Sequence, residues 1–259
     1  MPFVEHQGLH YFTFESFPSG LIHGILTRKG GVSPEPWASL NLGGTVGDDP
    51  QRVRENRLRA LEALGRSPDS VFDAWQVHGT GVFRADAPRP ADMPHPKADI
   101  LLTDRPQVTL LMRFADCVPI FLVDRRHGAI ALIHAGWKGT VEGAARVAVQ
   151  AMQAHYGTRP QDVLAGIGPS IGPDHYEVGA DVIEQVRKNF GREADRLLIP
   201  HNGSIHFDLW EANRLLLESV GVEQIEIAGL CTACDLEHWY SHRAEKGRTG
   251  RFGAIFAIE

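Results

Sequence analysis

The stretch ILLTDRPQVTLLMRFADCVPIFLVDRRHGAIALIH (100–134) decides the fold class of this chain. It contains short apolar segments, each bounded by Asp, Pro or Gly, at Ile100–Thr103, Val108–Arg113, Val118–Asp124 and Ala129–His134. Short apolar segments of this kind are typical of β-strands. The connections between them are too short for a crossover helix, so we predict that these strands are mainly antiparallel neighbours.

Strands and helices continue on both sides of this stretch. The same criteria predict strands at Leu21–Thr27, Val71–Val77, Val163–Ile167, Ile225–Cys231 and Ala254–Ile258. Capping residues and apolar faces predict four helices. The first runs from Asp49 and Pro50 to Gly65, and the second from Gly139 or Thr140 to the region of Gly157. The third carries Val178, Val182, Val186 and Phe190, and the fourth runs from Asp208 to Gly221. Many strands with a few interspersed helices predict an α/β or α+β layered domain, and we expect no domain boundary.

Composition limits the classes of function. The chain has 259 residues, of which 43% are hydrophobic and 22% are charged, as in an ordinary soluble globular protein. A formal charge of −6 without a basic run argues against nucleic acid as a partner. The apolar runs are too short for a membrane-spanning helix. The N-terminal segment does not resemble a signal peptide and three cysteines are too few for a disulfide framework, so we expect a cytoplasmic protein.

Three segments carry residues that folding explains poorly. They are QVHG (76–79), ADCVP (115–119) and HAGWKG (134–139), and each places a His or Cys where an apolar strand gives way to a turn. His78, Cys117 and His134 would supply two imidazoles and one thiolate, which suit zinc with an open fourth position for water or substrate. The sequence therefore predicts one open metal site.

Other interpretations of these residues stay open. Cys117 and His134 would also suit a cysteine nucleophile and its base, a reading that differs from the metal site only over His78. A lone Cys after a strand is often a buried apolar group, and the ligand spacing matches no compact zinc finger. We interpret Asp116 as a carboxylate that orients a histidine.

Several further segments suit anion or substrate binding. Glycine turns with nearby cations or hydroxyls occur at TRKGGVS (27–33), SLNLG (39–43), HAGWKG (134–139), IGPSIGP (167–173) and TGR (249–251). Most such turns only connect elements. Cys231 and Cys234 form half of a zinc pattern, with His238 and His242 nearby, and we favour reduced thiols over a minor structural site.

Taken together, these segments resemble one family along nearly the whole chain. It is the family long described as multicopper polyphenol oxidase or laccase-like, and now associated with purine nucleoside phosphorylase activity. The matching segments are TRKGGVS (27–33), SLNLG (39–43), NR (56–57), QVHG (76–79), ADCVP (115–119), HAGWKG (134–139), IGPSIGP with YEV (167–178), FDLW with AN (207–213), CT (231–232) and TGR (249–251).

The resemblance implies a fold and a site. The fold would be a single domain over residues 1–259, a four-layer α-β-β-α sandwich with mixed sheets. Zinc, or alternatively copper, would be bound by His78, Cys117 and His134. We expect catalytic roles for Cys117, His134, Lys138 and Arg28. The expected substrate-binding residues are Arg28, Lys29, Ser39, Asn41, Gln76, Asp116, Trp137, Ser170 and Arg251.

The resemblance also implies activities. Family members are credited with phosphorolysis of adenosine, inosine and methylthioadenosine, and with adenosine deamination. Some bacterial members instead act as peptidoglycan editing factors. Three positions depart from the family pattern: Lys138 stands where arginine is common, His175 replaces a frequent Cys, and Ala244 follows Arg243 where a second arginine is usual. These departures leave the ligands intact and bear on substrate preference.

The histidines argue against the oxidase chemistry in the family's older name. A multicopper oxidase needs many histidines in His-X-His pairs, and the 13 histidines here include no such pair. Our leading hypothesis is zinc-assisted attack on a purine nucleoside, with Arg28 and Lys138 holding phosphate. The alternatives are an amidohydrolase that edits cell-wall precursors and a non-catalytic nucleoside or metal sensor. We expect no nucleic-acid or membrane partner, and a monomer or homodimer.

Overall fold

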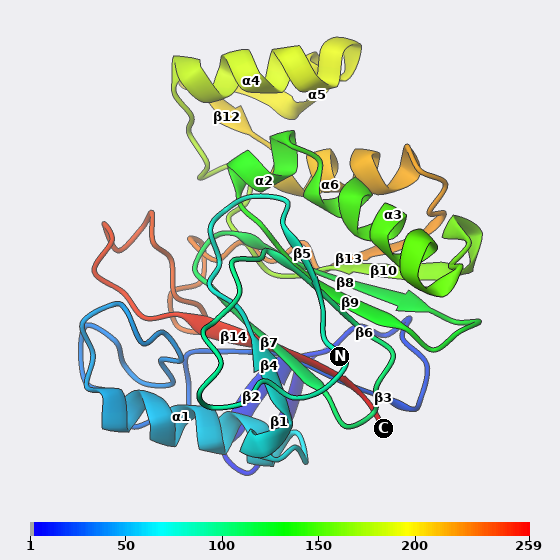
Figure 1. Ribbon diagram of the computed structural model, residues 1–259. Helices are drawn as coiled ribbons and strands as arrows, with labels where there is room; N and C mark the ends of the chain where they lie inside the picture. Colours follow the sequence, from blue (N-terminus) through cyan, green and yellow to red (C-terminus); the bar gives the residue numbers. More distant parts are fainter. Residues whose placement is uncertain (1–2) are drawn as a thin grey trace.

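The computed structural model describes residues 3–259 and contains two large mixed sheets packed face to face (Figure 1). The first sheet has the strand order β1-β2-β3-β14-β7-β4. Its strands are β1 (Phe3–His6), β2 (Leu9–Phe12), β3 (Leu21–Leu26), β14 (Phe252–Ile258), β7 (Thr109–Phe114) and β4 (Val71–Asp73). All neighbours in it are antiparallel except β7 and β4, which are parallel.

The second sheet has the order β13-β10-β8-β9-β6-β5. Its strands are β13 (Gln224–Ile227), β10 (Val163–Ile167), β8 (Val118–Asp124), β9 (Ile130–Ala135), β6 (Ile100–Thr103) and β5 (Val82–Arg84). The pairs at its two edges, β13 with β10 and β5 with β6, are parallel, and the central pairs are antiparallel. A small antiparallel hairpin, β11 (Leu198–His201) with β12 (Ser204–Phe207), lies apart from both sheets.

Helices cover the outer face of each sheet (Figure 1). The α-helices are α1 (Pro50–Ala63), α2 (Trp137–Val141), α3 (Ala144–Tyr156), α4 (Ala180–Phe190), α5 (Ala194–Leu197) and α6 (Leu209–Glu218), and short 3-10 helices lie at Pro68–Ser70, Pro160–Asp162 and Gly191–Glu193. Helix α1 covers the first sheet, while α2, α3 and α6 cover the second, with α4, α5 and the hairpin outside them. The predicted four-layer α-β-β-α sandwich is therefore confirmed.

Each interface between layers has its own apolar core. Between the two sheets, the aromatic side chains of Phe14, Phe121 and Phe256 pack together and are almost inaccessible to solvent. A second cluster joins the other sheet to α2, α3, α4 and α6, and a third joins the first sheet to α1. Burial of such side chains is the main favourable term in folding, and these three clusters join the four layers to one another.

The strand predictions for residues 100–134 are correct in position and partly wrong in pairing. Strands β6, β8 and β9 are antiparallel neighbours, as expected. Strand β7 instead crosses to the first sheet, where it lies between β14 and β4. Both faces of β7 and β8 are buried almost throughout, so neither strand has a polar face that would reveal its sheet. The apolar pattern alone could not detect the crossing.

The predicted starts of helices α1 and α6, which rest on capping residues, are confirmed. Asp49 accepts a hydrogen bond from the amide of Gln51 at the start of α1, and Asp208 accepts one from Glu211 at the start of α6. The expected helix from Gly139 to Gly157 is wrong as a single element. It begins earlier, at Trp137, and Gly143 with a φ of 86° divides it into α2 and α3.

Further boundaries differ from expectation, and strand β4 ends at Asp73 rather than Val77. Val178 does not belong to α4, because its backbone N–H bonds to Ile205 and the neighbouring Glu177 pairs with His206. Strand β13 ends at Ile227 rather than Cys231. The hairpin β11–β12 was not predicted, although Asn202-Gly203, with φ of 48° and 85°, is a strong two-residue turn signal.

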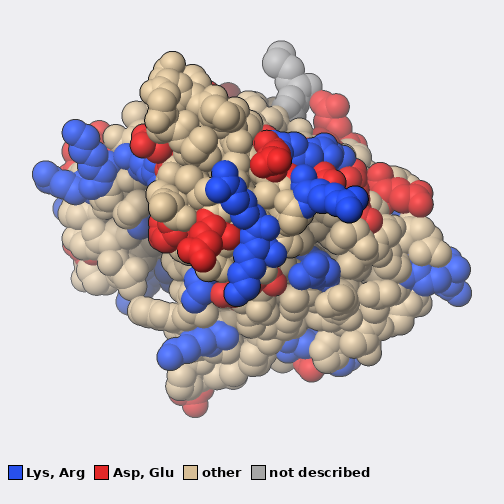
Figure 2. Space-filling view, turned by 90° about the horizontal axis from the view of Figure 1, so that it is seen from above, with Lys and Arg blue, Asp and Glu red and all other residues tan. Residues whose placement is uncertain are grey.

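Figure 2 shows how charged side chains are distributed on one face of the molecule. On the face shown in Figure 2, Lys and Arg side chains are interspersed with Asp and Glu, and no basic stripe crosses it. Within residues 3–259, no helix combines the length and the apolar character needed to cross a membrane.

Candidate active site

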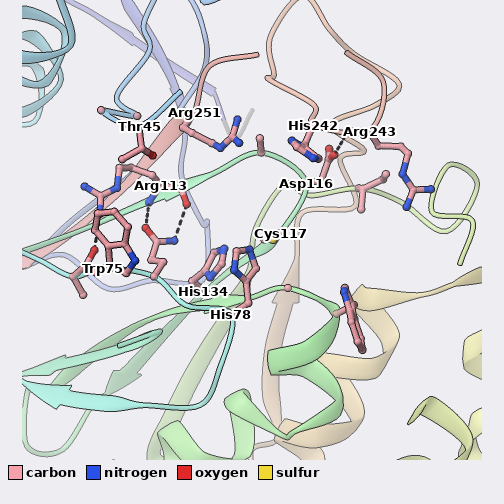
Figure 3. Close-up of a pocket in the computed structure, with 18 of the residues that line it drawn as sticks. Thr45, Trp75, His78, Arg113, Asp116, Cys117, His134, His242, Arg243 and Arg251 are labelled. Carbon is pink, nitrogen blue, oxygen red and sulfur yellow. Dashed lines mark hydrogen bonds between the residues drawn. The ribbon is translucent and has the colours of Figure 1, made fainter. Parts of the chain in front are cut away.

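The structure brings His78, Cys117 and His134 together at one end of the sandwich (Figure 3). His78 lies in the loop after β4, Cys117 in the connection between β7 and β8, and His134 near the end of β9. One potential ligand atom from each lies within 4.8 Å of the other two, and the two imidazole rings are 4.9 Å apart. Residues 39 and 17 positions apart in the sequence thus form one compact donor set.

Asp99 orients the residues of this donor set, and it was not among the site residues predicted from the sequence. The residue is fully buried at the start of β6. Its carboxylate accepts the Nδ1–H of His134 at 2.8 Å, which leaves Nε2 of His134 facing the other donors. It also accepts the backbone N–H groups of Val77, His78 and Gly79. One carboxylate therefore orients a histidine and fixes the loop that carries another.

A carboxamide fastens the same loop on its other side. The Gln76 side chain donates to the backbone carbonyl of Arg113 at 2.8 Å and accepts from the backbone N–H of Arg113 at 3.0 Å. Gln76 therefore pairs with β7 as a strand residue would, and it lines the cavity described below. The φ of His78 is 59°, which is uncommon for a residue with a side chain, so this loop needs such support.

The turn before Cys117 is held in a similar way. Asp116 has a φ of 81°, and its carboxylate accepts hydrogen bonds from the hydroxyl of Thr232 at 2.7 Å and from the backbone N–H of Arg243 at 2.6 Å. The interpretation that Asp116 orients a histidine is therefore wrong. Asp99 takes that role, and Asp116 ties the β7–β8 turn to two distant loops, as Figure 3 shows for Arg243.

Gly136 is required by the packing around the donor set. A Cβ atom at this position would lie 3.0 Å from the Cys117 sulfur and 3.2 Å from Cδ2 of His78. The residue is also the N-cap of helix α2, so the HAGWKG segment runs directly from the His134 strand into a helix. Any side chain here would displace two of the three donors.

The donors form a charged pair in the protein. Burial by itself raises the pKa of the Cys117 thiol, but the charges of His134 and His78 and their hydrogen bonds outweigh it and lower the pKa to about 6. Burial by itself lowers the pKa of His134, but Cys117 and Asp99 outweigh it and raise the pKa to about 9. The site therefore favours a thiolate, the form that binds a metal or acts as a nucleophile.

A cavity of about 660 Å³ opens above the donor set. Of the residues predicted for the site, His78, Cys117, His134, Gln76, Asp116, Trp137 and Arg251 line it. Lining residues that the sequence did not indicate are the arginines Arg57, Arg113 and Arg243, the histidines His95 and His242, and the aromatic residues Trp75 and Tyr176. Arg57 belongs to the NR segment (56–57), and Arg243 directly follows His242, so both lay within or beside segments already singled out.

The predicted anion-binding cations Arg28 and Lys29 do not line this cavity. The Arg28 guanidinium pairs with Glu245 at 3.1 Å, donates to the carbonyl of Ala38 and lies 4.5 Å from the centre of the Tyr240 ring. Lys29 pairs with Glu237. Arg28 thus joins two loops that build the wall of the sandwich, and the structure gives it no contact with the donor set.

The remaining predicted residues are also placed away from the cavity lining. The hydroxyl of Ser39 bonds to backbone groups, Ser170 is fully buried and accepts from Trp210, and Lys138 is exposed on α2 near Glu142. Asn41 is buried, and its side-chain oxygen accepts the backbone N–H of Arg251 at 2.9 Å. Its contribution to the site is therefore to position Arg251.

The family model described as multi-copper polyphenol oxidoreductase laccase matches residues 22–259. The chain belongs to this laccase family. It is 36% identical to a protein of Bacteroides thetaiotaomicron over 94% of this chain and 93% of that one, and 40% identical to a protein of Deinococcus radiodurans over 91% and 88%. Both relatives are named purine nucleoside phosphorylase.

Two solved structures have the same fold as this chain. The hypothetical protein YfiH of Bacillus licheniformis superposes with a TM-score of 0.92 at 32% identity, covering 100% of this chain and 99% of that one. YlmD of Geobacillus stearothermophilus gives a TM-score of 0.88 at 34% identity, with coverage of 100% and 99%. This chain and the two solved structures therefore share the sandwich fold.

The donor set fits a single metal ion rather than the copper centres that the laccase name suggests. Two imidazoles and one thiolate are the donors of open zinc sites and also of blue-copper sites. Among residues 3–259, the only other group of three or more close metal-ligating side chains is a separate cluster of Asp174, His175, Cys231 and Cys234. Neither group has the multiple histidines of a trinuclear copper cluster.

Proposed function

We propose that this chain is a zinc-dependent purine nucleoside phosphorylase. The observation that carries the proposal is the position of His78, Cys117 and His134 at one end of a cavity whose lining includes four arginines. A metal donor set beside a cationic cavity suits a reaction between a neutral organic substrate and an inorganic anion. The names of the relatives in Bacteroides thetaiotaomicron and Deinococcus radiodurans support the same activity.

The donor set supports zinc as the metal. The neighbouring imidazoles lower the pKa of the Cys117 thiol to about 6, and the bond from Asp99 presents Nε2 of His134 to the other donors. Three protein ligands leave one coordination position open, as in catalytic zinc sites. When bound, zinc supplies a Lewis acid that polarises a substrate oxygen.

The arginines support phosphate as the anion. Arg251 and Arg113 lie above the donor set in Figure 3, and Arg243 lies beside Asp116. Within the described chain, the hydrogen bonds of the Arg251 guanidinium run from Nη1 to the carbonyls of Thr249 and Gly250. Its Nε and Nη2 groups therefore suit a bidentate contact with phosphate.

Aromatic side chains support a purine as the organic group. Trp75 is 53% exposed yet lines the cavity, and Trp137 and Tyr176 line it as well. Purine rings stack on such faces, and each base stacked contributes about 1–3 kcal/mol. A cavity of this volume also matches the size of ordinary small-molecule sites. Adenosine, inosine and methylthioadenosine are the proposed nucleosides.

In the proposed reaction, a phosphate oxygen forms a bond to C1′ of the ribose as the bond from C1′ to the purine nitrogen breaks. The electron pair of that bond leaves with the purine, which takes up a proton. Arg251 holds the phosphate in position, while Arg113, which pairs with Asp73 at 2.9 Å, adds positive charge to the cavity wall, and the aromatic side chains hold the departing base. Proximity and orientation of two bound reactants supply much of the rate increase in such reactions.

The test is to incubate the purified protein with inosine and phosphate and to measure hypoxanthine and ribose 1-phosphate. We expect both products from the wild type and neither from Cys117→Ala. Formation of ribose without ribose 1-phosphate would identify hydrolysis instead, and conversion of adenosine to inosine without phosphate would identify deamination. Equal yields from wild type and Cys117→Ala would overturn the proposal. Chelation followed by addition of zinc or copper identifies the metal that restores activity.

One observation favours a second candidate. Cys117, His134 and Asp99 follow one another as nucleophile, base and orienting carboxylate, an arrangement that suits an amidohydrolase acting on cell-wall precursors. Chelation and thiol alkylation distinguish the two candidate functions. Activity that survives chelation and is lost on thiol alkylation supports the amidohydrolase, whereas activity lost on chelation and restored by metal supports the phosphorylase.

A further inference from the structure

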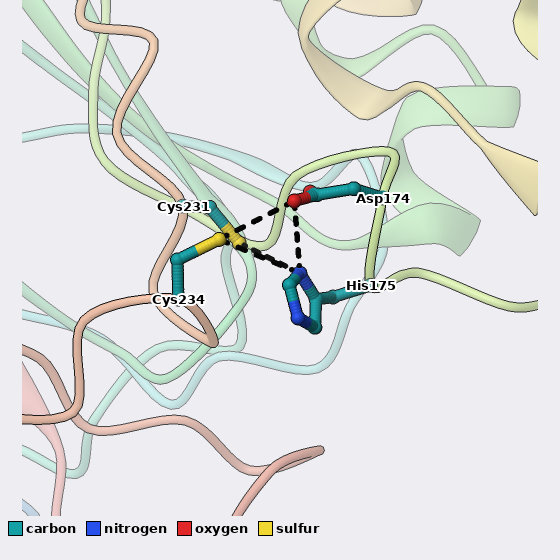
Figure 4. Close-up of side chains that lie close together, drawn as sticks. All are labelled: Asp174, His175, Cys231 and Cys234. Atoms are coloured by element: carbon teal, nitrogen blue, oxygen red, sulfur yellow. Dashed lines mark hydrogen bonds and ion pairs between the residues drawn. The ribbon is translucent and has the colours of Figure 1, made fainter.

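A second group of metal-ligating side chains lies outside the candidate active site (Figure 4). Asp174 and His175 come from the loop after β10, and Cys231 and Cys234 come from the CTAC turn after β13. One potential ligand atom from each of the four lies within 4.8 Å of the others. The turn brings its two thiols together, and Figure 4 shows the carboxylate and the imidazole pointing toward them.

The spacing of these atoms matches a tetrahedral zinc site. The sulfur of Cys231 lies 3.8 Å from Nδ1 of His175, and the sulfur of Cys234 lies 3.4 Å from the same nitrogen. The sulfur of Cys234 is 3.3 Å from Oδ2 of Asp174, and that oxygen is 3.1 Å from Nδ1 of His175. With zinc bonds of about 2.3 Å to sulfur and about 2.0–2.1 Å to nitrogen or oxygen, tetrahedral geometry separates sulfur from nitrogen or oxygen by about 3.5 Å, and nitrogen from oxygen by about 3.3 Å.

The surrounding backbone is shaped for the same group. The N–H of Gly172 donates a hydrogen bond to the sulfur of Cys231 at 3.1 Å, a contact that stabilises a thiolate. A Cβ atom at Gly172 would lie 2.7 Å from Oδ1 of Asp174 and 3.1 Å from Cβ of Cys231. A larger residue at this position would therefore require the Asp174 carboxylate and the Cys231 side chain to shift.

We propose that Asp174, His175, Cys231 and Cys234 bind a structural zinc ion. Four protein donors complete a tetrahedron and leave no position for substrate, which distinguishes this site from the open donor set at Cys117. The sequence analysis favoured reduced thiols here, and named His238 and His242 as the nearby histidines. In the structure His238 bonds to Asp235 and His242 lines the cavity, while His175 joins the two cysteines.

The ion would fasten two loops that form part of the cavity wall. Tyr176, which lines the cavity, directly follows His175 and lies 5.0 Å beneath the guanidinium of Arg243. Thr232, inside the CTAC turn, donates to Asp116 next to Cys117. Loss of the ion therefore loosens Tyr176 and the Asp116 turn without removing a catalytic donor, and binding to the folded chain stabilises it.

The experiment measures zinc per chain in protein purified under reducing conditions. We expect two zinc ions in the wild type, one in Cys117→Ala, one in Cys234→Ser, and none in the variant that combines both changes. His238→Gln removes a histidine of the same loop that lies outside the cluster, and should keep both ions. If the proposed function is wrong about the active-site zinc, the wild type holds one ion that only Cys234→Ser removes.

Cobalt substitution in the Cys117→Ala background gives a second measurement. Two bound thiolates produce a strong near-ultraviolet charge-transfer band, which we expect to disappear in His175→Ala and to persist, with higher intensity, in His175→Cys. The latter variant keeps four donors, so it separates loss of metal from loss of folding. Zinc content unaffected by Cys234→Ser and His175→Ala, or a Cys231–Cys234 disulfide in the metal-free protein that reduction does not convert to a metal site, would overturn the proposal.

Discussion

Oδ1 of Asp99 lies 2.8 Å from Nδ1 of His134, and the same carboxylate accepts the backbone N–H groups of Val77, His78 and Gly79. Burial raises the pKa of the Asp99 carboxyl, but His134 and the backbone donors outweigh it and lower the pKa. A single buried charge thus sets the orientation of one candidate ligand and the position of another. Replacing Asp99 should therefore weaken metal binding more than it destabilises the fold.

We expect Asp99→Asn to bind its active-site metal about 10–100-fold more weakly. The carboxamide has one oxygen, so it cannot accept all four hydrogen bonds, and its nitrogen would face a backbone N–H. Titration against a competing chelator measures the affinity. Unchanged affinity would show that Asp99 is only a structural carboxylate.

Asp124→Asn is the matched control for this substitution. Asp124 is also fully buried, and its carboxylate accepts from Nδ1 of His127 at 2.8 Å and from two backbone N–H groups. It lies at the far end of β8, about 23 Å from Cys117 at about 3.3 Å per residue. Its loss should lower stability and leave metal affinity as it is in the wild type.

Gly136→Ala should reduce metal content and activity while the protein remains folded. The added Cβ meets the Cys117 sulfur at 3.0 Å and His78 at 3.2 Å, and overpacking of this kind costs about 1–3 kcal/mol when neighbours must move. Zinc analysis and circular dichroism together measure the effect. Gly79→Ala is the control, because a Cβ there meets nothing closer than 3.9 Å, and it should behave as the wild type.

Arg251→Gln should raise the KM for phosphate about tenfold or more and leave the KM for inosine nearly unchanged. Loss of one charge-assisted contact costs about 1.5–3 kcal/mol, and the contact proposed here involves the anion alone. Arg248→Gln removes an exposed arginine from the same segment and serves as the control. Equal increases in both KM values would place Arg251 in the architecture of the cavity rather than in phosphate binding.

His23 should make stability depend on pH. Its Nε2 accepts the N–H of Phe14 at 3.0 Å, and its ring packs against Phe14, Phe17 and Phe121. Burial lowers the pKa of His23 from 6.5 to about 4. Between these values the unfolded chain binds the proton and the folded chain does not, so stability falls as pH drops through this window, by up to about 3 kcal/mol from this group.

Urea denaturation at several pH values between 7 and 4.5 measures this slope. His23→Gln keeps a neutral hydrogen-bond acceptor and should flatten the pH dependence relative to the wild type. His155→Gln, which removes an exposed imidazole from α3, should keep the wild-type slope. A wild-type slope that survives in His23→Gln would show that other groups cause it.

The sequence predicted the elements better than their arrangement. Capping residues such as Asp49 and Asp208 act within one turn, so the starts of α1 and α6 could be predicted locally. The crossing of β7 to the first sheet could not, because that choice depends on packing between residues far apart in the chain. Gly143 divides α2 from α3 through a backbone conformation that an apolar face does not reveal.

The candidate site shows the same difference between local features, which the sequence reveals, and long-range contacts, which it does not. His78, Cys117 and His134 were identified because each interrupts an apolar pattern, and the structure brings them within reach of one metal ion. Asp99 was missed because it stands immediately before an apolar strand, where aspartate usually marks a turn. Arg28 and Lys29 were expected to bind substrate from their charge, but their pairing with Glu245 and Glu237 depends on contacts more than 200 positions away. Charge alone does not reveal a partner so distant in sequence.

The crossing between β7 and β8 has one more consequence. Strand β4 belongs to one sheet and β9 to the other, and Cys117 lies on the short connection that leads from the first sheet to the second. An ion bound by His78, Cys117 and His134 would therefore cross-link the two sheets of the sandwich. Hydrogen exchange should then be slowest at this end of both sheets when metal is bound, and should rise there first when it is withdrawn.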